Sequence, residues 1–136
     1  SDCLALAADK AAEVRVFSHV TGGGLGQNLA RVIPTGLQAT VDRGAWEVPA
    51  VFKVMQGLGN VPWNDIEHTL NMGVGMIAIV SEQGADAALA RLKSLGVPAW
   101  VLGTVGEDTG EAVGANLVRG AKGIVGGSVS LHGEYR

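Results

Sequence analysis

The sequence contains little cysteine, few aromatic residues and no cluster of positive charge. Its single cysteine, Cys3, excludes an intramolecular disulfide and a cysteine-rich zinc site, and is expected to be a bystander rather than a nucleophile. Aromatic residues make up 4% of the chain, and 10 basic residues stand against 13 acidic ones, for a formal net charge of -3. Such a chain lacks the cluster of basic and aromatic side chains that binds a phosphodiester backbone, so no nucleic-acid partner is expected.

Long hydrophobic runs are also missing. No apolar stretch approaches the roughly 20 residues that a bilayer span needs. The opening segment, SDCLALAADK, lacks the basic region and hydrophobic core of a signal peptide. We therefore expect a cytoplasmic protein with no membrane anchor. The 136 residues, 47% of them hydrophobic, suffice for a single packed domain over residues 1–136.

Glycine, by contrast, is abundant, at 21 of 136 residues, about twice the usual share. Hydrophobic periodicity, bounded by glycine and proline, predicts helices alternating with strands. The expected helices cover 3–12, 26–33, a segment from Pro49 to Gly59, a short segment after Pro62, and 83–95. The expected strands cover 14–20, 37–42, 72–80, 99–105 and 128–133.

This alternation predicts an α+β fold in which helices pack on a mixed β-sheet. Residues 72–105 are expected to form a β-α-β unit, and the nearly continuous apolar run 72–80 is expected to be a central strand buried on both faces. The stretch 106–127 holds seven glycines and is predicted to be a mobile loop.

Common catalytic signatures are absent. The segment GVGMIA, residues 73–78, matches the dinucleotide pattern G-x-G-x-x-A, but a strand is expected after it where that pattern needs a helix. The phosphate loop G-x-x-x-x-G-K-[ST], the zinc motif H-E-x-x-H and the nucleophile elbow G-x-S-x-G do not occur. The main classes of NTPase, metalloprotease and hydrolase therefore lose their support, and no metal ligands are predicted.

The segment HVTGGGLGQN, residues 19–28, has a strand, glycines and a helix in the order that an anion site requires. Successive glycines let backbone N–H groups point into one concavity, and a helix N-terminus adds positive potential there. His19 and Thr21 are candidate donors to the same anion, which Gly22, Gly23 and Gly24 would bind. A tight turn without a ligand, and a purely structural histidine, remain open alternatives.

Two further polar residues stand at predicted loop positions. Asp42 follows a strand and either presents a functional carboxylate or forms an Asx-type turn before a helix. Asn71 precedes MGVGM and either faces a cleft or ends a helix in a left-handed conformation. His68 and His132 show no partner pattern.

Taken together, three segments carry a resemblance to a known family. HVTGGGLGQNLARVIP, VDRGAWEVPAVFKVMQGLGNV and NMGVGM, in this order and spacing, closely resemble the C-terminal domain of phosphoribosylformylglycinamidine cyclo-ligases, or aminoimidazole ribonucleotide synthetases. The similarity runs from about Glu13 to Gly103, and the remainder matches only in general character. It implies an α+β domain, partly ferredoxin-like, that forms most of the C-terminal domain of a larger two-domain enzyme.

The resemblance also implies an activity. In the family, ATP phosphorylates the amide oxygen of formylglycinamidine ribonucleotide, and the amidine nitrogen then closes the imidazole ring of aminoimidazole ribonucleotide. The family enzyme is a homodimer whose active site lies between its domains, and its N-terminal half carries an Asp-Gly-Val-Gly-Thr-Lys segment with most of the ATP and Mg²⁺ contacts. That segment is absent from this sequence, so the chain alone is expected to be inactive.

Residue by residue, the family's H-x-T-G-G-G loop matches His19, Thr21 and Gly22–Gly24, its D-x-x-x-W matches Asp42 and Trp46, and its N-x-G-x-G matches Asn71, Gly73 and Gly75. The resemblance implies that His19, Asp42 and Asn71 line the cleft and are candidates for catalysis. It also implies that the glycine loop binds phosphate. A fragment of a sister synthetase, such as formylglycinamidine ribonucleotide synthetase, and a non-catalytic binding or assembly module are the alternatives.

Overall fold

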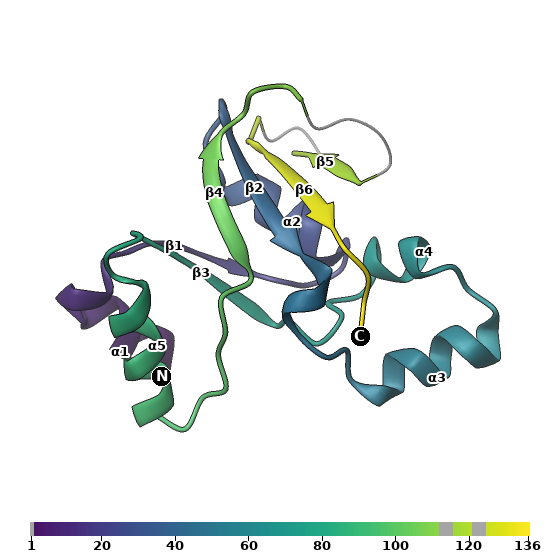
Figure 1. Cartoon of the computed structure of the whole chain (residues 1–136), viewed down its shortest axis with the longest axis horizontal. Helices are drawn as coiled ribbons and strands as arrows, with labels where there is room; N and C mark the ends of the chain where they lie inside the picture. The colour runs from purple at the N-terminus through teal and green to yellow at the C-terminus, as the bar shows by residue number, and fades with distance from the viewer. Residues whose placement is uncertain (1, 112–115, 121–124) are drawn as a thin grey trace. The chain divides into compact units, whose positions relative to one another are not determined.

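The computed structural model describes residues 2–111, 116–120 and 125–136. Helices and strands alternate along them (Figure 1), which confirms the predicted α+β class. The elements are α1 (Asp2–Ala8), the 3-10 helix η1 (Lys10–Ala12), β1 (Val14–His19), α2 (Gly24–Val32), β2 (Leu37–Asp42), the 3-10 helix η2 (Arg43–Ala45), α3 (Ala50–Gly59), α4 (Trp63–Glu67), β3 (Met76–Val80), α5 (Ala85–Ser94), β4 (Gly103–Glu107), β5 (Leu117–Arg119) and β6 (Ser128–His132).

The larger sheet has four strands in the order β4-β2-β6-β5. β2 pairs antiparallel with β4 and parallel with β6, and β5 pairs antiparallel with β6. The sheet is therefore mixed, as the sequence predicts. Because successive side chains of a strand alternate between faces, Ala39, Val129 and Val118, which are register partners, share one face and are buried there. α2 packs on this sheet, so closely that a Cβ on Gly26 would lie 2.9 Å from Val118.

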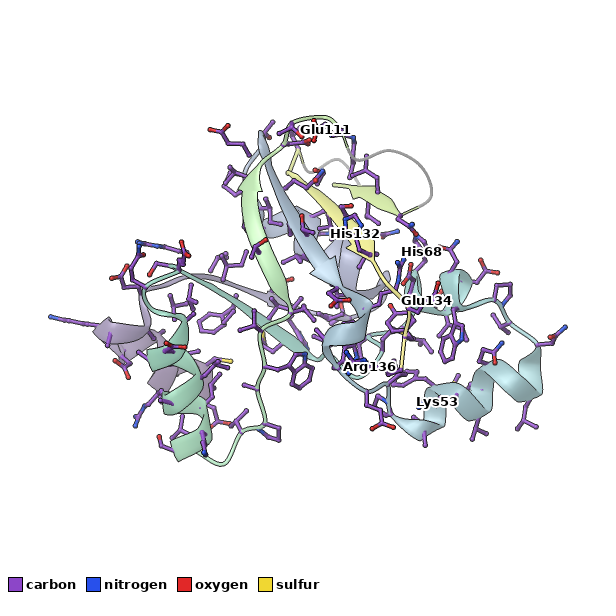
Figure 2. The ribbon with its side chains drawn as sticks, in the orientation of Figure 1. Lys53, His68, Glu111, His132, Glu134 and Arg136 are labelled. Atoms are coloured by element: carbon purple, nitrogen blue, oxygen red, sulfur yellow. The ribbon has the colours of Figure 1, made fainter. Side chains whose placement is uncertain are left out.

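The other face of the same sheet is polar. It carries Gln38, Thr40 and Asp42 from β2, and their register partners Ser128, Ser130 and His132 from β6. His132, labelled in Figure 2, lies at the end of β6, and its Nε2 is 2.7 Å from Ser130 Oγ. Ser128 Oγ accepts a hydrogen bond from Gln38 Nε2 at 3.0 Å. These bonds satisfy side chains that would otherwise be buried without partners.

The described chain divides into two compact units. In the first, which joins residues up to Phe17 with Ala78–Val101, Leu6, Ala12 and Ala88 form a small core between α1, η1 and α5. The second joins Ser18–Ile77 with Leu102–Arg136 and contains the four-stranded sheet, α2, α3 and α4. Every residue of the predicted site belongs to this second unit.

Two predictions about residues 72–105 are wrong. β3 pairs with β1 and β4 pairs with β2, so β3, α5 and β4 do not form a β-α-β unit of one sheet. β3 is also shorter than predicted and its residues are half-buried or exposed, so it is not a central strand buried on both faces. Local hydrophobicity marked an extended segment but could not specify its pairing partner, which lies far away in the chain.

The predictions for the following segments also need correction. The strand expected at 99–105 is β4 at Gly103–Glu107, in register with β2. The stretch 106–127 contains the end of β4 and all of β5, and residues 112–115 and 121–124 of the predicted loop lie outside the described part of the chain. The terminal strand at β6 is confirmed, and all its residues except His132 are buried.

α3 forms where it was predicted but buries none of its residues. The apolar side chains at helical spacing, Val51, Val54, Met55 and Leu58, are 58%, 55%, 48% and 87% exposed. Soluble monomers seldom display contiguous apolar surface of this kind without a use for it.

Candidate functional site

The glycine turn, residues Thr21–Gly24, connects β1 to α2. The Gly24 N–H donates to the Thr21 carbonyl at 3.2 Å, which closes the turn, and Gly23 is the N-cap of α2. His19, Thr21 and Gly22 are exposed, and the predicted order of strand, glycines and helix is confirmed. Solvent therefore reaches the turn at Thr21 and Gly22, whereas Gly24, the first residue of the nine-residue helix α2, is buried.

The three glycines of the turn differ in how strongly the backbone requires glycine at each position. Gly24 has a φ of +71°, and a Cβ there would overlap the backbone carbonyl of Glu67 at the end of α4. Gly23 has a φ of +102°, which also favours glycine, although its nearest neighbour is only the flexible end of Gln27. Gly22 has neither constraint: φ is not positive and a Cβ would meet nothing within 4 Å. The fold explains Gly23 and Gly24 but not Gly22.

The turn also has backbone donors without partners. Among the described residues, the N–H groups of Gly22 and Gly23 have no hydrogen-bond acceptor, and the first N–H groups of a helix have none within the helix. An anion that accepted from these groups would also lie at the positive end of the α2 dipole. The turn therefore has the chemistry of an anion site.

Asn28, which the sequence analysis did not select, holds the turn from inside. Its Nδ2 donates to the carbonyls of Gly24 at 2.7 Å and Thr21 at 3.2 Å, and the residue is only 5% exposed. Its Oδ1 lies 3.4 Å from the Thr21 hydroxyl. An asparagine among the apolar positions of a predicted helix was the available signal.

The loop Asn71–Gly75 lies beside the end of β1. The Val20 N–H donates to the Gly75 carbonyl at 3.0 Å, which brings this loop next to the glycine turn. Asn71 Oδ1 accepts from the Gly73 N–H at 3.0 Å, and Met72 and Gly73 take the left-handed conformations that the sequence analysis had offered for Asn71. Gly75, like Gly22, has open space where a Cβ would be. The strand β3 follows, as predicted, at the place where a dinucleotide loop needs a helix.

Asp42 and Trp46 have structural roles in this chain. Asp42 is exposed and its Oδ1 accepts from the Gly44 N–H at 2.8 Å, so the Asx-type turn offered as the alternative is present. Trp46 is 7% exposed and donates from Nε1 to the Met72 carbonyl at 2.9 Å. It therefore ties the DRGAW segment to the Asn71–Gly75 loop from the interior instead of lining a surface. No hydrogen bond among the described residues joins Asp42 to the glycine turn.

A buried ion pair, also missed from the sequence, lies between η2 and α4. Arg43 donates from Nε and Nη2 to the two oxygens of the Glu67 carboxylate at 2.8 and 2.7 Å, and the Tyr135 hydroxyl donates to Oε2 at 2.7 Å. Arg43 also donates to the Leu131 carbonyl at 3.0 Å and to Asn116 Oδ1 at 3.1 Å. The side chains of Arg43 and Glu67 are 10% and 3% exposed.

The ion pair sets the protonation states of its members. Burial alone would raise the pKa of Glu67, but the hydrogen bonds from Arg43 and Tyr135 outweigh it, and the pKa is lowered. The hydrogen bond with Glu67 raises the pKa of Arg43, and burial raises the pKa of Tyr135. At neutral pH the cluster thus consists of a carboxylate, a guanidinium and a neutral phenol.

Nowhere in residues 2–111, 116–120 and 125–136 do three or more His, Cys, Asp or Glu side chains gather as a metal site would require. No helix in the described part of the chain has the length and apolar character needed to cross a bilayer.

Comparison with known proteins adds three relatives and a family. Residues 1–116 match the family described as AIR synthase related protein, C-terminal domain. A Streptomyces fradiae protein named "Putative phosphoribosylformylglycinamidine cyclo-ligase" is 49% identical over 134 residues, which are 98% of this chain and 66% of that protein. A phosphoribosylformylglycinamidine cyclo-ligase of Caldicellulosiruptor bescii is 43% identical over 70% of this chain and 28% of its own length.

The third relative is the bifunctional purine biosynthetic protein ADE5,7 of Saccharomyces cerevisiae, 46% identical over 78% of this chain and 13% of its own length. The chain thus spans about two thirds of the Streptomyces protein and less than a third of the other two.

Proposed function

The chain belongs to the family of AIR synthase related proteins, C-terminal domain, and on that premise we propose that it forms most of the C-terminal domain of a phosphoribosylformylglycinamidine cyclo-ligase of purine biosynthesis. The whole enzyme would use ATP to phosphorylate the amide oxygen of formylglycinamidine ribonucleotide. Attack by the amidine nitrogen then closes the ring and releases phosphate, giving aminoimidazole ribonucleotide and ADP. The names of the Streptomyces and Caldicellulosiruptor relatives support this assignment.

The observation that carries the proposal is the open space above Gly22. The glycine turn offers N–H groups without acceptors at a helix N-terminus, and a side chain at Gly22 would fill the approach although the fold does not forbid one. Gly75, in the neighbouring loop, is equally bare. Phosphoryl transfer depends on positioning and on neutralising charge more than on a nucleophilic side chain, so backbone donors suit it.

In this proposal the N–H groups of Gly22 and Gly23 bind a phosphate group of ATP or of the ribonucleotide, and Thr21 and His19 lie beside it. Gly24, which the sequence predicted to bind the same group, is buried and its N–H donates to the Thr21 carbonyl, so it closes the turn instead. Asp42 and Asn71 face the cleft that another part of the enzyme closes. Mg²⁺ needs several oxygen ligands, and the described residues hold no cluster of carboxylates for it. In this proposal the Mg²⁺ and most ATP contacts belong to a further domain. The whole enzyme is proposed to be a cytoplasmic homodimer.

The test is a graft into a working relative. The matching segment of the Caldicellulosiruptor cyclo-ligase is replaced by this chain, and ATP-dependent formation of aminoimidazole ribonucleotide is measured. Three grafts are compared: the unchanged chain, Gly22→Ala, and Gly106→Ala as a matched control, since Gly106 is also free of close neighbours but lies on β4.

We expect turnover from the unchanged graft and from Gly106→Ala, and a large loss from Gly22→Ala. Folded grafts that all lack turnover would contradict the cyclo-ligase assignment. If these grafts convert ATP to ADP only when the substrate of a sister synthetase replaces formylglycinamidine ribonucleotide, that sister synthetase becomes the better assignment. If they bind partners without using ATP, the chain is a binding or assembly module.

A further inference from the structure

The Arg43–Glu67 ion pair connects segments that are far apart in the sequence. Arg43 is the first residue of η2 and directly follows Asp42, whereas Glu67 is the last residue of α4. The other bonds of the pair reach Asn116 and the C-terminal stretch from Leu131, at the end of β6, to Gly133 and Tyr135. The pair therefore fixes four segments of the second unit against each other at one point.

Glu67 also touches the proposed site through its backbone. Its carbonyl is the group that a Cβ on Gly24 would overlap, so the end of α4 packs directly on the first residue of α2. The same residue thus holds Arg43 with its side chain and supports the glycine turn with its main chain. A shift of α4 would move the surface on which Gly24 rests.

We propose that Arg43, Glu67 and Tyr135 are positioning residues that hold the glycine turn and the Asp42 end of β2 in one arrangement. The part of this proposal that concerns ligand affinity rests on the proposed function, but the part that concerns the turn does not. No hydrogen bond among the described residues joins these side chains to the glycine turn. They act by fixing the Glu67 main chain on one side and the start of η2 on the other.

The geometry favours positioning over general stabilisation. A buried ion pair is weak evidence for stability, since apolar residues of the same volume often do as well, and its best-attested use is to select one arrangement among several. Here the pairing is bidentate, and the Glu67 oxygens accept from two partners. Planar two-point pairing of this kind fixes direction as well as distance.

The experiment uses this chain labelled with ¹⁵N and compares three variants. Glu67→Gln removes the negative charge that faces Arg43, and Tyr135→Phe removes only the hydroxyl that donates to Glu67. Tyr135→Phe keeps the test usable if Glu67→Gln does not fold. Val129→Ala is the control, because it weakens the completely buried face of β6 without contacting the cluster. All are studied at temperatures equally far below their own melting temperatures.

The first readout is hydrogen exchange of the Gly24 N–H, which donates to the Thr21 carbonyl. We expect Glu67→Gln and Tyr135→Phe to accelerate this exchange at least tenfold relative to Val129→Ala, while amides of β4 exchange alike in all three. Equal Gly24 exchange in the cluster variants and the control would overturn the positioning role, because a merely stabilising pair loosens the unit uniformly.

The second readout is the dissociation constant for inorganic phosphate, followed by the amide shifts of Gly22 and Gly23. We expect it to rise at least threefold in the two cluster variants and to stay unchanged in Val129→Ala. Phosphate that fails to bind the unchanged chain would contradict the proposed phosphate role, and the exchange measurement would still decide the positioning role. Binding that is equal in all folded variants would refute the link between the cluster and the site.

Discussion

Replacing the three consecutive glycines by alanine one at a time should give three different losses of stability. Gly22 has open space and no positive φ, Gly23 has a φ of +102° with only the Gln27 side chain nearby, and Gly24 has a φ of +71° against the Glu67 carbonyl. The substitution is chemically identical each time. Any difference among the variants therefore measures the backbone surroundings of each position.

The expected magnitudes follow from these surroundings. Gly22→Ala should be neutral or stabilise by up to about 1 kcal/mol, because it only restricts the unfolded chain. Gly23→Ala should cost about 1–2 kcal/mol for a left-handed alanine, since Gln27 can move aside. Gly24→Ala adds the displacement of a backbone carbonyl that cannot rotate away, for a total above roughly 3 kcal/mol.

Thermal unfolding followed by circular dichroism measures the series. For a domain of this size, 1 kcal/mol corresponds to roughly 3–5 °C in melting temperature. Gly22→Ala should therefore melt at or slightly above the temperature of the unchanged chain, and Gly24→Ala should melt at least 10 °C lower if it folds (about 3 kcal/mol). The reasoning is refuted if Gly22→Ala and Gly24→Ala melt together, or if Gly22→Ala is the less stable of the two.

Three further predictions follow from other parts of the chain. The exposed apolar face of α3 should make the chain self-associate, and Val54→Lys with Leu58→Lys should reduce that association in sedimentation without lowering the melting temperature, because the two side chains are 55% and 87% exposed. A chain that does not associate, or that associates equally with both substitutions, would show that this face drives no association. The fold lowers the pKa of Glu67 from its ordinary value of 4.5, so the ionised carboxylate stabilises the folded chain above pH 4.5, and this stabilisation is lost as the pH falls through the lower pKa of the folded state. Glu67→Gln should therefore reduce the dependence of the unfolding free energy on pH in the acid range, and an unchanged dependence would contradict this. The purified chain alone should form no aminoimidazole ribonucleotide from formylglycinamidine ribonucleotide and ATP, and steady product formation would overturn the assignment of the Mg²⁺ and ATP contacts to another domain.

Local sequence signals were sufficient for much of the fold. The helices α2, α3 and α5 and the strands β2 and β6 lie close to their predicted ranges, because each has a periodic apolar pattern bounded by glycine or proline. The pairing of β3 and β4 with different sheets was not predictable in this way. Strand pairing depends on side chains distant in the sequence, and no local pattern in residues 72–105 records it.

The local structure of the candidate site was predicted in outline, but the contacts that support it were missed. The order of strand, glycines and helix was visible in residues 19–28, and so was the Asx-type alternative for Asp42. That Gly24 must be glycine depends on Glu67, far along the chain, and could not be inferred locally. The Arg43–Glu67 pair gave no signal either, since a charged residue in a turn is ordinarily solvated.

The most direct test of the central claim, that the glycine turn binds a phosphate of the reaction, is calorimetric titration of the grafted enzyme carrying Gly22→Ala. A methyl group in the anion's approach should cost on the order of one charge-assisted hydrogen bond, about 1.5–3 kcal/mol. Affinity for ATP or for formylglycinamidine ribonucleotide should then fall about ten- to a hundredfold, with no loss of melting temperature. If both ligands bind Gly22→Ala as they bind the unchanged graft, the three glycines are only a turn and the claim is contradicted.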